Sequence, residues 1–167
     1  MTQAIAPADI AVDARSLARR SRADLDRVFA ALPAPSAAQL VGALRGTVVD
    51  LAGLGRLPPG LRAGLLSALR GPAGVWRGKR FAGALGTNVW GVGRFERPFA
   101  AFRVDSGPAI DGSGSCVRLD YDVAENPLPL RAILGEVRAL GPGLFLGRMH
   151  YRAGSATACV LYFTLEA

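Results

Sequence analysis

The stretch Gly74-Val75-Trp76-Arg77-Gly78-Lys79-Arg80-Phe81 opens the part of the chain that decides the fold. From here to the C-terminus, short segments of strand-forming residues alternate with breaks rich in Gly and Pro. Regular short strands separated by turn signals are typical of an all-β barrel or sandwich. Strands that close on themselves make a cup, and a cup implies a bound small molecule.

The strand pattern extends to both sides of this stretch. We expect strands at residues 44–51, 75–82, 87–95, 99–104, 116–123, 136–140, 144–152 and 158–166. Asn126-Pro127-Leu128-Pro129 interrupts the series, and residues 130–134 are either one helical turn or an irregular strand. The strands therefore predict a mostly antiparallel barrel.

Helical signals lie mainly near the N-terminus. Residues 9–32 are expected to be helical, and Ser21 can cap a fresh turn within them. Ser36 and Gln39 have the spacing of a capping box. Pro58-Pro59 opens a further helix, at 58–70, which we expect to pack across one end or side of the barrel. We divide the chain into a helical extension, 1–35, and a β-barrel domain, 36–167.

The charge of the chain is strongly basic but dispersed. The 167 residues carry a formal net charge of +7. Nineteen of the 20 basic residues are Arg, a ratio typical of a GC-rich genome, and the remaining one is Lys79. The wide spacing of these arginines indicates solvated side chains whose apolar stems pack on the surface. It disfavours a face that binds nucleic acid. The alternative, an anion or nucleic-acid binder, requires an exterior patch that contains Arg62, Arg70, Arg77 and Arg80.

The cysteines, the N-terminal residues and the hydropathy of the chain together predict its cellular compartment. Cys116 and Cys159 do not make a disulfide framework, and we expect two reduced thiols. The N-terminal residues lack the pattern of a signal peptide. No apolar stretch approaches the roughly 18 residues of a membrane span. We therefore expect a cytoplasmic protein.

Two predicted strands each have one charged and one apolar face. The period of two places Arg118 and Asp120 opposite Tyr121, and it places Arg148 and His150 together on a later strand. Charged faces usually point outward. The alternative is an inward network of these groups around the headgroup of a ligand, which costs desolvation unless each charge is paired.

Chemical motifs are sparse. His150 is the single histidine, so an acid–base pair or triad would have to use it, for example with Asp120. No nucleophile elbow is present, and one His with two distant Cys does not make a zinc spacing. We assign no catalytic residue, metal or cofactor.

Several blocks together carry a family resemblance. They include Gly74-Val75-Trp76-Arg77-Gly78, which fits Gly-x-Trp-x-Gly, then Asp120-Tyr121-Asp122, and then Leu144-Phe145-Leu146-Gly147-Arg148-Met149. Across residues 25–166 the chain resembles small bacterial lipocalin-like proteins, including those with a GXWXG domain. Leu44 stands where that family would have Trp. The resemblance implies a lipocalin-like barrel with a helical N-terminal extension, and it carries over no catalytic residue.

The sequence favours a binding protein over an enzyme. The expected ligand is small and hydrophobic or amphipathic, with an acidic form as one option. The enzyme and the surface binder remain alternatives, nucleic acid is not the expected partner, and a homodimer stays open. The candidate ligand-binding residues are Trp76, Trp90, Arg118, Asp120, Tyr121, Arg148 and His150.

Overall fold

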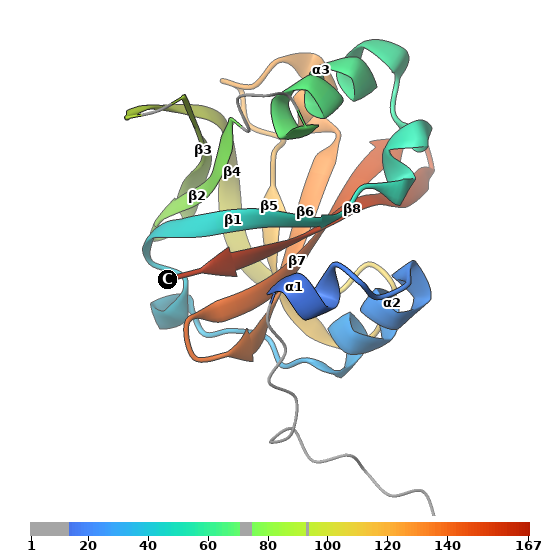
Figure 1. Ribbon diagram of the computed structural model, residues 1–167, viewed down its shortest axis with the longest axis vertical. Helices are drawn as coiled ribbons and strands as arrows, with labels where there is room; N and C mark the ends of the chain where they lie inside the picture. Colours follow the sequence, from blue (N-terminus) through green and yellow to red (C-terminus); the bar gives the residue numbers. More distant parts are fainter. Residues whose placement is uncertain (1–13, 71–74, 93) are drawn as a thin grey trace, which may run out of the picture.

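A closed barrel forms the body of the molecule. The computed structural model describes residues 14–70, 75–92 and 94–167. Within them, eight strands pair antiparallel in chain order, and the last strand closes on the first (Figure 1). The predicted fold class is confirmed: a mainly β, lipocalin-like antiparallel β-barrel with an N-terminal helical extension and an inserted helix.

The strands agree with the expected series, with some shifted ends. Their bounds are β1 (Gly42–Asp50), β2 (Trp76–Ala82), β3 (Leu85–Val92), β4 (Phe95–Pro108), β5 (Ser115–Asp120), β6 (Ile133–Gly141), β7 (Leu144–Ala153) and β8 (Ala156–Glu166).

The largest shift concerns β4. Phe95 was expected to end the preceding strand, and Arg97-Pro98 was expected to be a break. Instead β4 begins at Phe95, and Pro98 lies in the ladder opposite Val89. A strand tolerates Pro where the ladder does not need that N–H, so the proline does not end the strand.

The N-terminal helical segment is divided in two. The structure has α1 (Ala14–Leu17) and α2 (Arg22–Ala31), and residues 9–13 of the expected helix lie outside the described residues. Ser21 separates them because its hydroxyl accepts a hydrogen bond from the amide of Asp24, at 3.2 Å. Asp24 bonds back to the amide of Ser21, at 3.3 Å, which completes a capping box.

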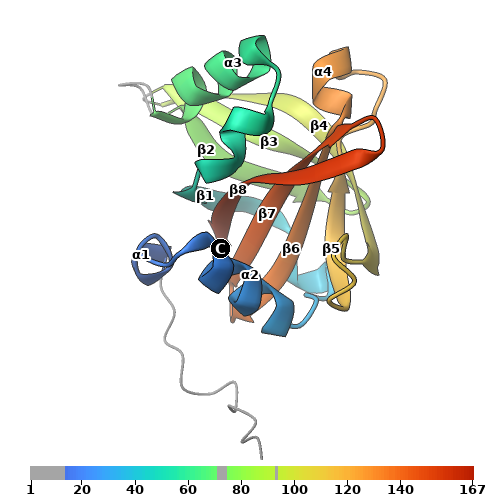
Figure 2. The same cartoon turned by 90° about the vertical axis from the view of Figure 1, so that its right-hand side faces the viewer.

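Short helices connect the strands. The 3-10 turns η2 (Ala37–Gln39) and η3 (Ala52–Arg56) flank β1, α3 (Pro59–Arg70) precedes β2, and α4 (Leu128–Arg131) precedes β6. The predicted helix end at Gly71-Pro72 lies outside the described residues. Figure 2 shows α3 and α4 at the same end of the barrel, while α2 lies against its flank near β6 and β7. Among the described helices, none combines the length and apolar character needed to cross a membrane.

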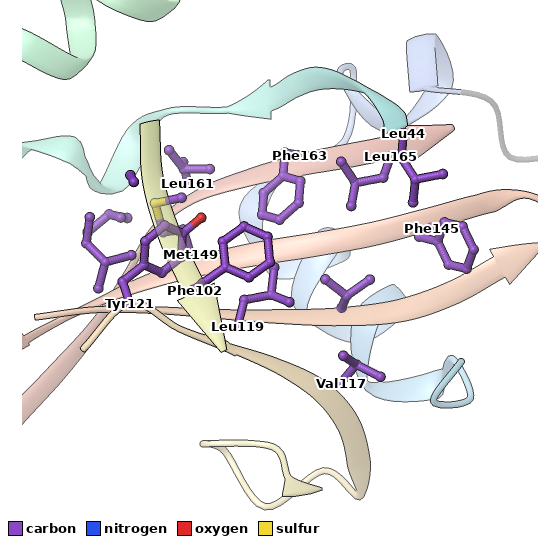
Figure 3. Packing of buried hydrophobic residues seen from close by; sticks show 14 of the residues in the cluster. Leu44, Phe102, Val117, Leu119, Tyr121, Phe145, Met149, Leu161, Phe163 and Leu165 are labelled. Atoms are coloured by element: carbon purple, nitrogen blue, oxygen red, sulfur yellow. The ribbon is translucent and has the colours of Figure 1, made fainter. Parts of the chain in front are cut away.

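Apolar side chains fill the barrel away from α3. Figure 3 shows Tyr121, Met149 and Leu161 at one end of the interior, then Phe102 and Phe163, and then a dense group at the far end. That group includes Leu44, Val117, Phe145 and Leu165, all nearly inaccessible to solvent. The barrel is thus packed solid over its far part.

Candidate functional site

The part of the barrel beneath α3 is hollow. It holds a cavity of about 590 Å³, a volume typical of small-molecule sites. α3 covers it through Leu61, Leu65 and Leu69, and the segment around α4 contributes Leu130. The residues that line the cavity are Val48, Gly60, Leu61, Gly64, Leu65, Leu69, Trp76, Asn88, Trp90, Phe99, Ala100, Tyr121, Pro127, Pro129, Leu130, Ile133, Met149, Leu161 and Phe163.

The cavity wall is almost wholly apolar. Asn88 is the one lining side chain with an amide, and hydrogen-bonding groups otherwise come from the Tyr121 hydroxyl and the two indoles. No charged side chain is among these described lining residues. Such a wall favours an apolar ligand body with a small polar group at a defined place.

Glycines on the strands allow the aromatic rings to lie against the wall. A methyl group at Gly46 would lie 2.3 Å from Cη2 of Trp76, and one at Gly147 would lie 2.2 Å from Cζ of Phe163. The two rings meet edge to face, with centroids 5.8 Å apart. Because each ring occupies the space of a missing side chain, room is left in the middle of the barrel.

A β-bulge turns both Trp76 and Lys79 into the interior. In a regular strand, residues three apart point to opposite faces. The pairing of β2 with β3 shifts between Trp76 and Gly78, so one extra residue enters β2 and the alternation is reset. Gly78 has φ of 137°, and a methyl group there would lie 2.0 Å from the carbonyl oxygen of Leu44. The bulge therefore requires glycine, which explains the Trp-x-Gly spacing.

Lys79 is fully buried at the floor of the cavity. Its Nζ bonds to Oδ1 of Asn88, at 2.6 Å, and to the hydroxyl of Tyr121, at 2.6 Å. The Asn88 oxygen also accepts from Nε1 of Trp76, at 3.2 Å. Since Trp76, Asn88 and Tyr121 line the cavity, the amine lies directly behind its polar groups.

The surroundings of the amine are aromatic. Nζ of Lys79 lies between 5.1 and 5.8 Å from the ring centroids of Trp76, Phe102, Tyr121 and Phe163. Within the described chain, no carboxylate lies in ion-pair distance of it. Burial alone lowers the pKa of Lys79 to about 7. The chain thus keeps a titratable amine in an apolar pocket without a counter-charge of its own.

A second bulge places Asn88. The register of β3 with β4 shifts after Thr87, and Ala100 is the extra residue, with φ of 66°. A non-glycine residue in this left-handed region is strained, and such strain often accompanies functional sites. Here the carbonyl of Ala100 accepts from Nδ2 of Asn88, at 3.3 Å, which holds the amide toward Lys79.

Comparison with known proteins supports the fold. No family model matches the chain, and the curated proteins give no match. The structure is similar to a crystal structure of a protein from Thermomonospora curvata, with a TM-score of 0.56 and 18% identity over 88% of this chain and 87% of that chain. Such a likeness concerns the fold alone. With the closed antiparallel barrel, it fits a lipocalin-like fold, and membership of the GXWXG-domain family is not shown.

Three of the predicted ligand-binding residues line the cavity: Trp76, Trp90 and Tyr121. Trp90 is held by a hydrogen bond from its Nε1 to the carbonyl of Phe99, at 3.1 Å. Tyr121 lies almost fully buried at the floor, and burial raises the pKa of its hydroxyl. The structure thus brings these three aromatic residues together around one space.

Arg148 and His150 lie on the outer face of the barrel, and α2 covers Arg148. Both contact the buried carboxylate of Glu136: Nε of Arg148 donates to Oε2 at 2.6 Å, and Nε2 of His150 lies 3.0 Å from the same oxygen. Phe29 of α2 covers the guanidinium of Arg148, with 4.1 Å from Cζ to the ring centroid. The histidine does have a carboxylate partner, but the pair is not among the cavity-lining residues.

The electrostatics of this outer cluster favour a fixed ion pair. Burial opposes ionisation of Glu136, but the hydrogen bond from His150 and the charge of Arg148 outweigh it and lower the pKa of Glu136 to about 2. The hydrogen bond from Arg148 also lowers the pKa of Asp111. The cluster attaches α2 and the loop before β5 to the sheet.

Arg118 and Asp120 also lie outside the cavity. Arg118 faces Asp105, with 3.8 Å between Nε and Oδ1, and both side chains are partly exposed. Asp120 accepts hydrogen bonds from Arg103, at 3.1 Å, and from Arg152, at 3.2 Å. The charged faces of β5 and β7 both point outward. The alternate positions, Leu119, Tyr121 and Met149, fill the interior (Figure 3).

The arginines of the middle segment are solvated. Arg62, Arg77 and Arg80 are exposed, and the side chain of Arg70 lies outside the described residues. The surface hollow that includes Arg45 and Arg77 also contains Glu96 and Glu166, so it carries both signs of charge. Among the described residues, no group of three or more His, Cys, Asp or Glu is placed to hold a metal ion.

Sequence reasoning did not select Lys79 or Asn88. Strict alternation from Trp76 places Lys79 outside, and the bulge at Gly78 reverses this. One signal was present, because Lys79 is the only lysine beside 19 arginines. An arginine stays charged at any physiological pH, whereas a buried lysine can lose its proton. A lone lysine in such a chain therefore indicates a position that needs an amine.

Proposed function

We propose that this protein binds a small amphipathic molecule inside the β-barrel. The apolar part of the ligand lies between α3 and the aromatic wall, and its polar group lies at the floor near Asn88 and Tyr121. The observation that supports the proposal is the apolar cavity of about 590 Å³ with a single polar end. The far half of the barrel is filled by side chains, so the hollow beneath α3 is not a general consequence of the fold.

The size and chemistry of the cavity also support this function over a surface role. Pockets of this volume bury most of a drug-sized molecule, and the affinity comes mainly from removing apolar surface from water. A reducing compartment such as the cytoplasm belongs to the proposal. It agrees with the free thiols of Cys116 and Cys159.

The test is a titration with an environment-sensitive apolar dye. We expect micromolar affinity, about −8 kcal/mol, and displacement of the dye by medium-chain alcohols. Trp90→Ala removes part of the cavity wall and should weaken binding roughly tenfold, about 1.4 kcal/mol. Phe95→Ala is the matched control, because Phe95 is 69% exposed and does not line the cavity.

Two results would count against the proposal. The folded protein could fail to take up any dye, or the Trp90→Ala and Phe95→Ala variants could lose dye affinity equally.

His150→Ala tests the enzyme alternative in the same assay. Because His150 lies on the outer face beside Glu136, we expect dye affinity to be unchanged while stability falls by about 1–3 kcal/mol.

A further inference from the structure

The hydrogen bonds at the cavity floor depend on the protonation of Lys79. As a neutral amine, Nζ donates to Asn88 and accepts the hydroxyl proton of Tyr121, while the Tyr121 oxygen accepts from Nδ2 of Asn88, at 3.0 Å. Each polar group then has a partner. The empty barrel therefore suits an uncharged Lys79.

As an ammonium, Lys79 leaves donors without acceptors. Nζ then donates to both Asn88 and Tyr121, and its third N–H faces aromatic rings. The hydroxyl proton of Tyr121 is left with a contact of 3.4 Å to Oδ1 of Asn88, which already accepts from Trp76 and Lys79. Buried donors without acceptors are costly. This floor therefore offers a ligand oxygen the hydroxyl of Tyr121, which lines the cavity, with the charge of the Lys79 ammonium directly behind it.

The counter-charge is also missing. The groups around Nζ come from five places in the barrel. They are Trp76 on β2, Asn88 on β3, Phe102 on β4, Tyr121 directly after β5, and Phe163 on β8. Of these, only Tyr121 titrates, and burial raises its pKa. A buried cation is costly unless a counter-charge or several oxygen acceptors surround it, as the carbonyl oxygens of Phe29 and Ala30 do for Arg138. Lys79 has aromatic rings in their place. Since the described chain supplies no anion at this place, the ligand must.

We propose that the ligand is an amphipathic monocarboxylic acid, whose carboxylate accepts from the Tyr121 hydroxyl and pairs with the ammonium of Lys79 while its hydrocarbon part fills the cavity beneath α3. This inference rests on the proposed binding function and names its ligand class. Lys79 supplies the counter-charge for the carboxylate, and Asn88 holds both Lys79 and Tyr121 in place. Arginine would not serve here, because it would remain charged in the empty barrel.

Proton uptake follows from this arrangement. Above pH 7 the empty protein holds Lys79 mainly as the neutral amine, because burial lowers its pKa to about 7. Binding of the carboxylate then takes one proton from solvent. Affinity for the acid should fall nearly tenfold per pH unit between pH 7.5 and 9, and only about twofold between pH 6 and 7. Affinity for an alcohol should not change over this range.

The experiment compares decanoic acid, 1-decanol and decanal by calorimetry at pH 6.5 and 8.5. At pH 6.5 we expect the acid to bind ten- to a hundredfold more tightly than the alcohol, the factor expected of a hydrogen bond to a charged group. At pH 8.5, buffers of different ionisation enthalpy should report close to one proton taken up per acid bound. Lys79→Met should remove the preference for the acid and keep binding of the alcohol. Arg80→Met, at the exposed neighbour on β2, should change neither.

The outcomes separate this inference from the proposed function. If 1-decanol binds as tightly as decanoic acid, or if acid binding takes up no proton at pH 8.5, the ligand class is wrong and the binding function stands. If neither compound binds, both proposals fail. If decanal condenses with the Lys79 amine, with loss of water, to an imine that added borohydride reduces to a stable secondary amine, and the acid is not preferred, the acid proposal is overturned in favour of an imine-forming amine. Should Lys79→Met not fold, the proton uptake of the unaltered protein decides.

Discussion

At the scale of single residues, burial decides the chemistry of this protein more than charge count does. The chain carries 20 basic residues, and Lys79 lies fully buried beside the cavity with no carboxylate of the described residues in ion-pair distance. On the outer face of the barrel, Arg148 is also buried, but Glu136 and Asp111 pair with it. These two of the buried cations therefore have opposite roles: Arg148 is held in a permanent ion pair, and Lys79 is free to titrate.

The buried lysine predicts a particular dependence of stability on pH. Between pH 7 and 10.5 the unfolded chain binds a proton at Lys79 that the folded protein does not hold, so the free energy of unfolding rises with pH. The slope approaches about 1.4 kcal/mol per pH unit above pH 7 and disappears below it. Chemical denaturation between pH 6 and 8.5 measures it, before the cysteines titrate in the unfolded chain. Lys79→Met should remove the rise; an identical rise in the variant would contradict the burial of the amine.

The ion pair on the outer face predicts a different loss. Glu136→Gln keeps the shape of the side chain but leaves Arg148 without its buried partner, which we expect to cost about 3–5 kcal/mol. Asp105→Asn removes a carboxylate from an exposed pair and should cost less than about 1 kcal/mol. Urea denaturation of the two variants gives the comparison. Equal losses would mean that the buried pair does not stabilise the fold.

At the scale of elements, two helices have separate tasks. α2 covers the charged outer face, where Arg138 donates to the carbonyl oxygens of Phe29 and Ala30, both at 2.8 Å. α3 covers the cavity with its leucines. Neither task follows from helix propensity, because each depends on which barrel surface the helix meets. Changes in the two helices should therefore separate stability from binding.

Phe29→Ala should affect stability alone. The ring is fully buried and lies against Arg138 and Arg148, so its removal should cost about 3–5 kcal/mol. Val28→Ala, at a half-buried neighbour, should cost much less. Thermal denaturation and dye binding on the same samples check this. A loss of dye affinity in the folded Phe29 variant would mean that α2 communicates with the cavity.

Leu65→Ala in α3 should show the reverse pattern. The side chain is half-buried and lines the cavity, so we expect dye affinity to fall roughly fivefold, about 1 kcal/mol, with little change in stability. Arg62→Ala lies on the exposed side of the same helix and provides the control. If both variants bind dye as the unaltered protein does, α3 is not the cover of a working site.

At the scale of the whole molecule, the barrel is solid at one end and hollow at the other. The far end is filled by Leu44, Val117, Phe145 and Leu165. Toward α3, rings lie over glycines on neighbouring strands, as Trp76 does over Gly46, and the centre stays open. The hollow is thus encoded by where small residues face large ones across the barrel.

Much of this fold could be predicted from local patterns, because strands, turns and helix caps depend on near neighbours. The Ser21 cap, the helix at 58–70 and the inward face of Tyr121 agree with the structure. The interior position of Lys79 could not be predicted, since it depends on a bulge defined by the partner strand. The cover over Arg148 also depends on Phe29, a residue more than 100 positions away.

The measurement that tests the binding claim most directly is a methyl NMR spectrum. The chain has two methionines, Met1 and Met149, and Met149 lines the cavity. With methionine methyls labelled, saturating decanoic acid should shift the Met149 methyl signal and give cross-relaxation between that methyl and the ligand chain. We expect both effects, and Trp90→Ala should weaken them. Binding of the acid without any contact to Met149 would place the ligand outside the cavity and contradict binding inside the barrel.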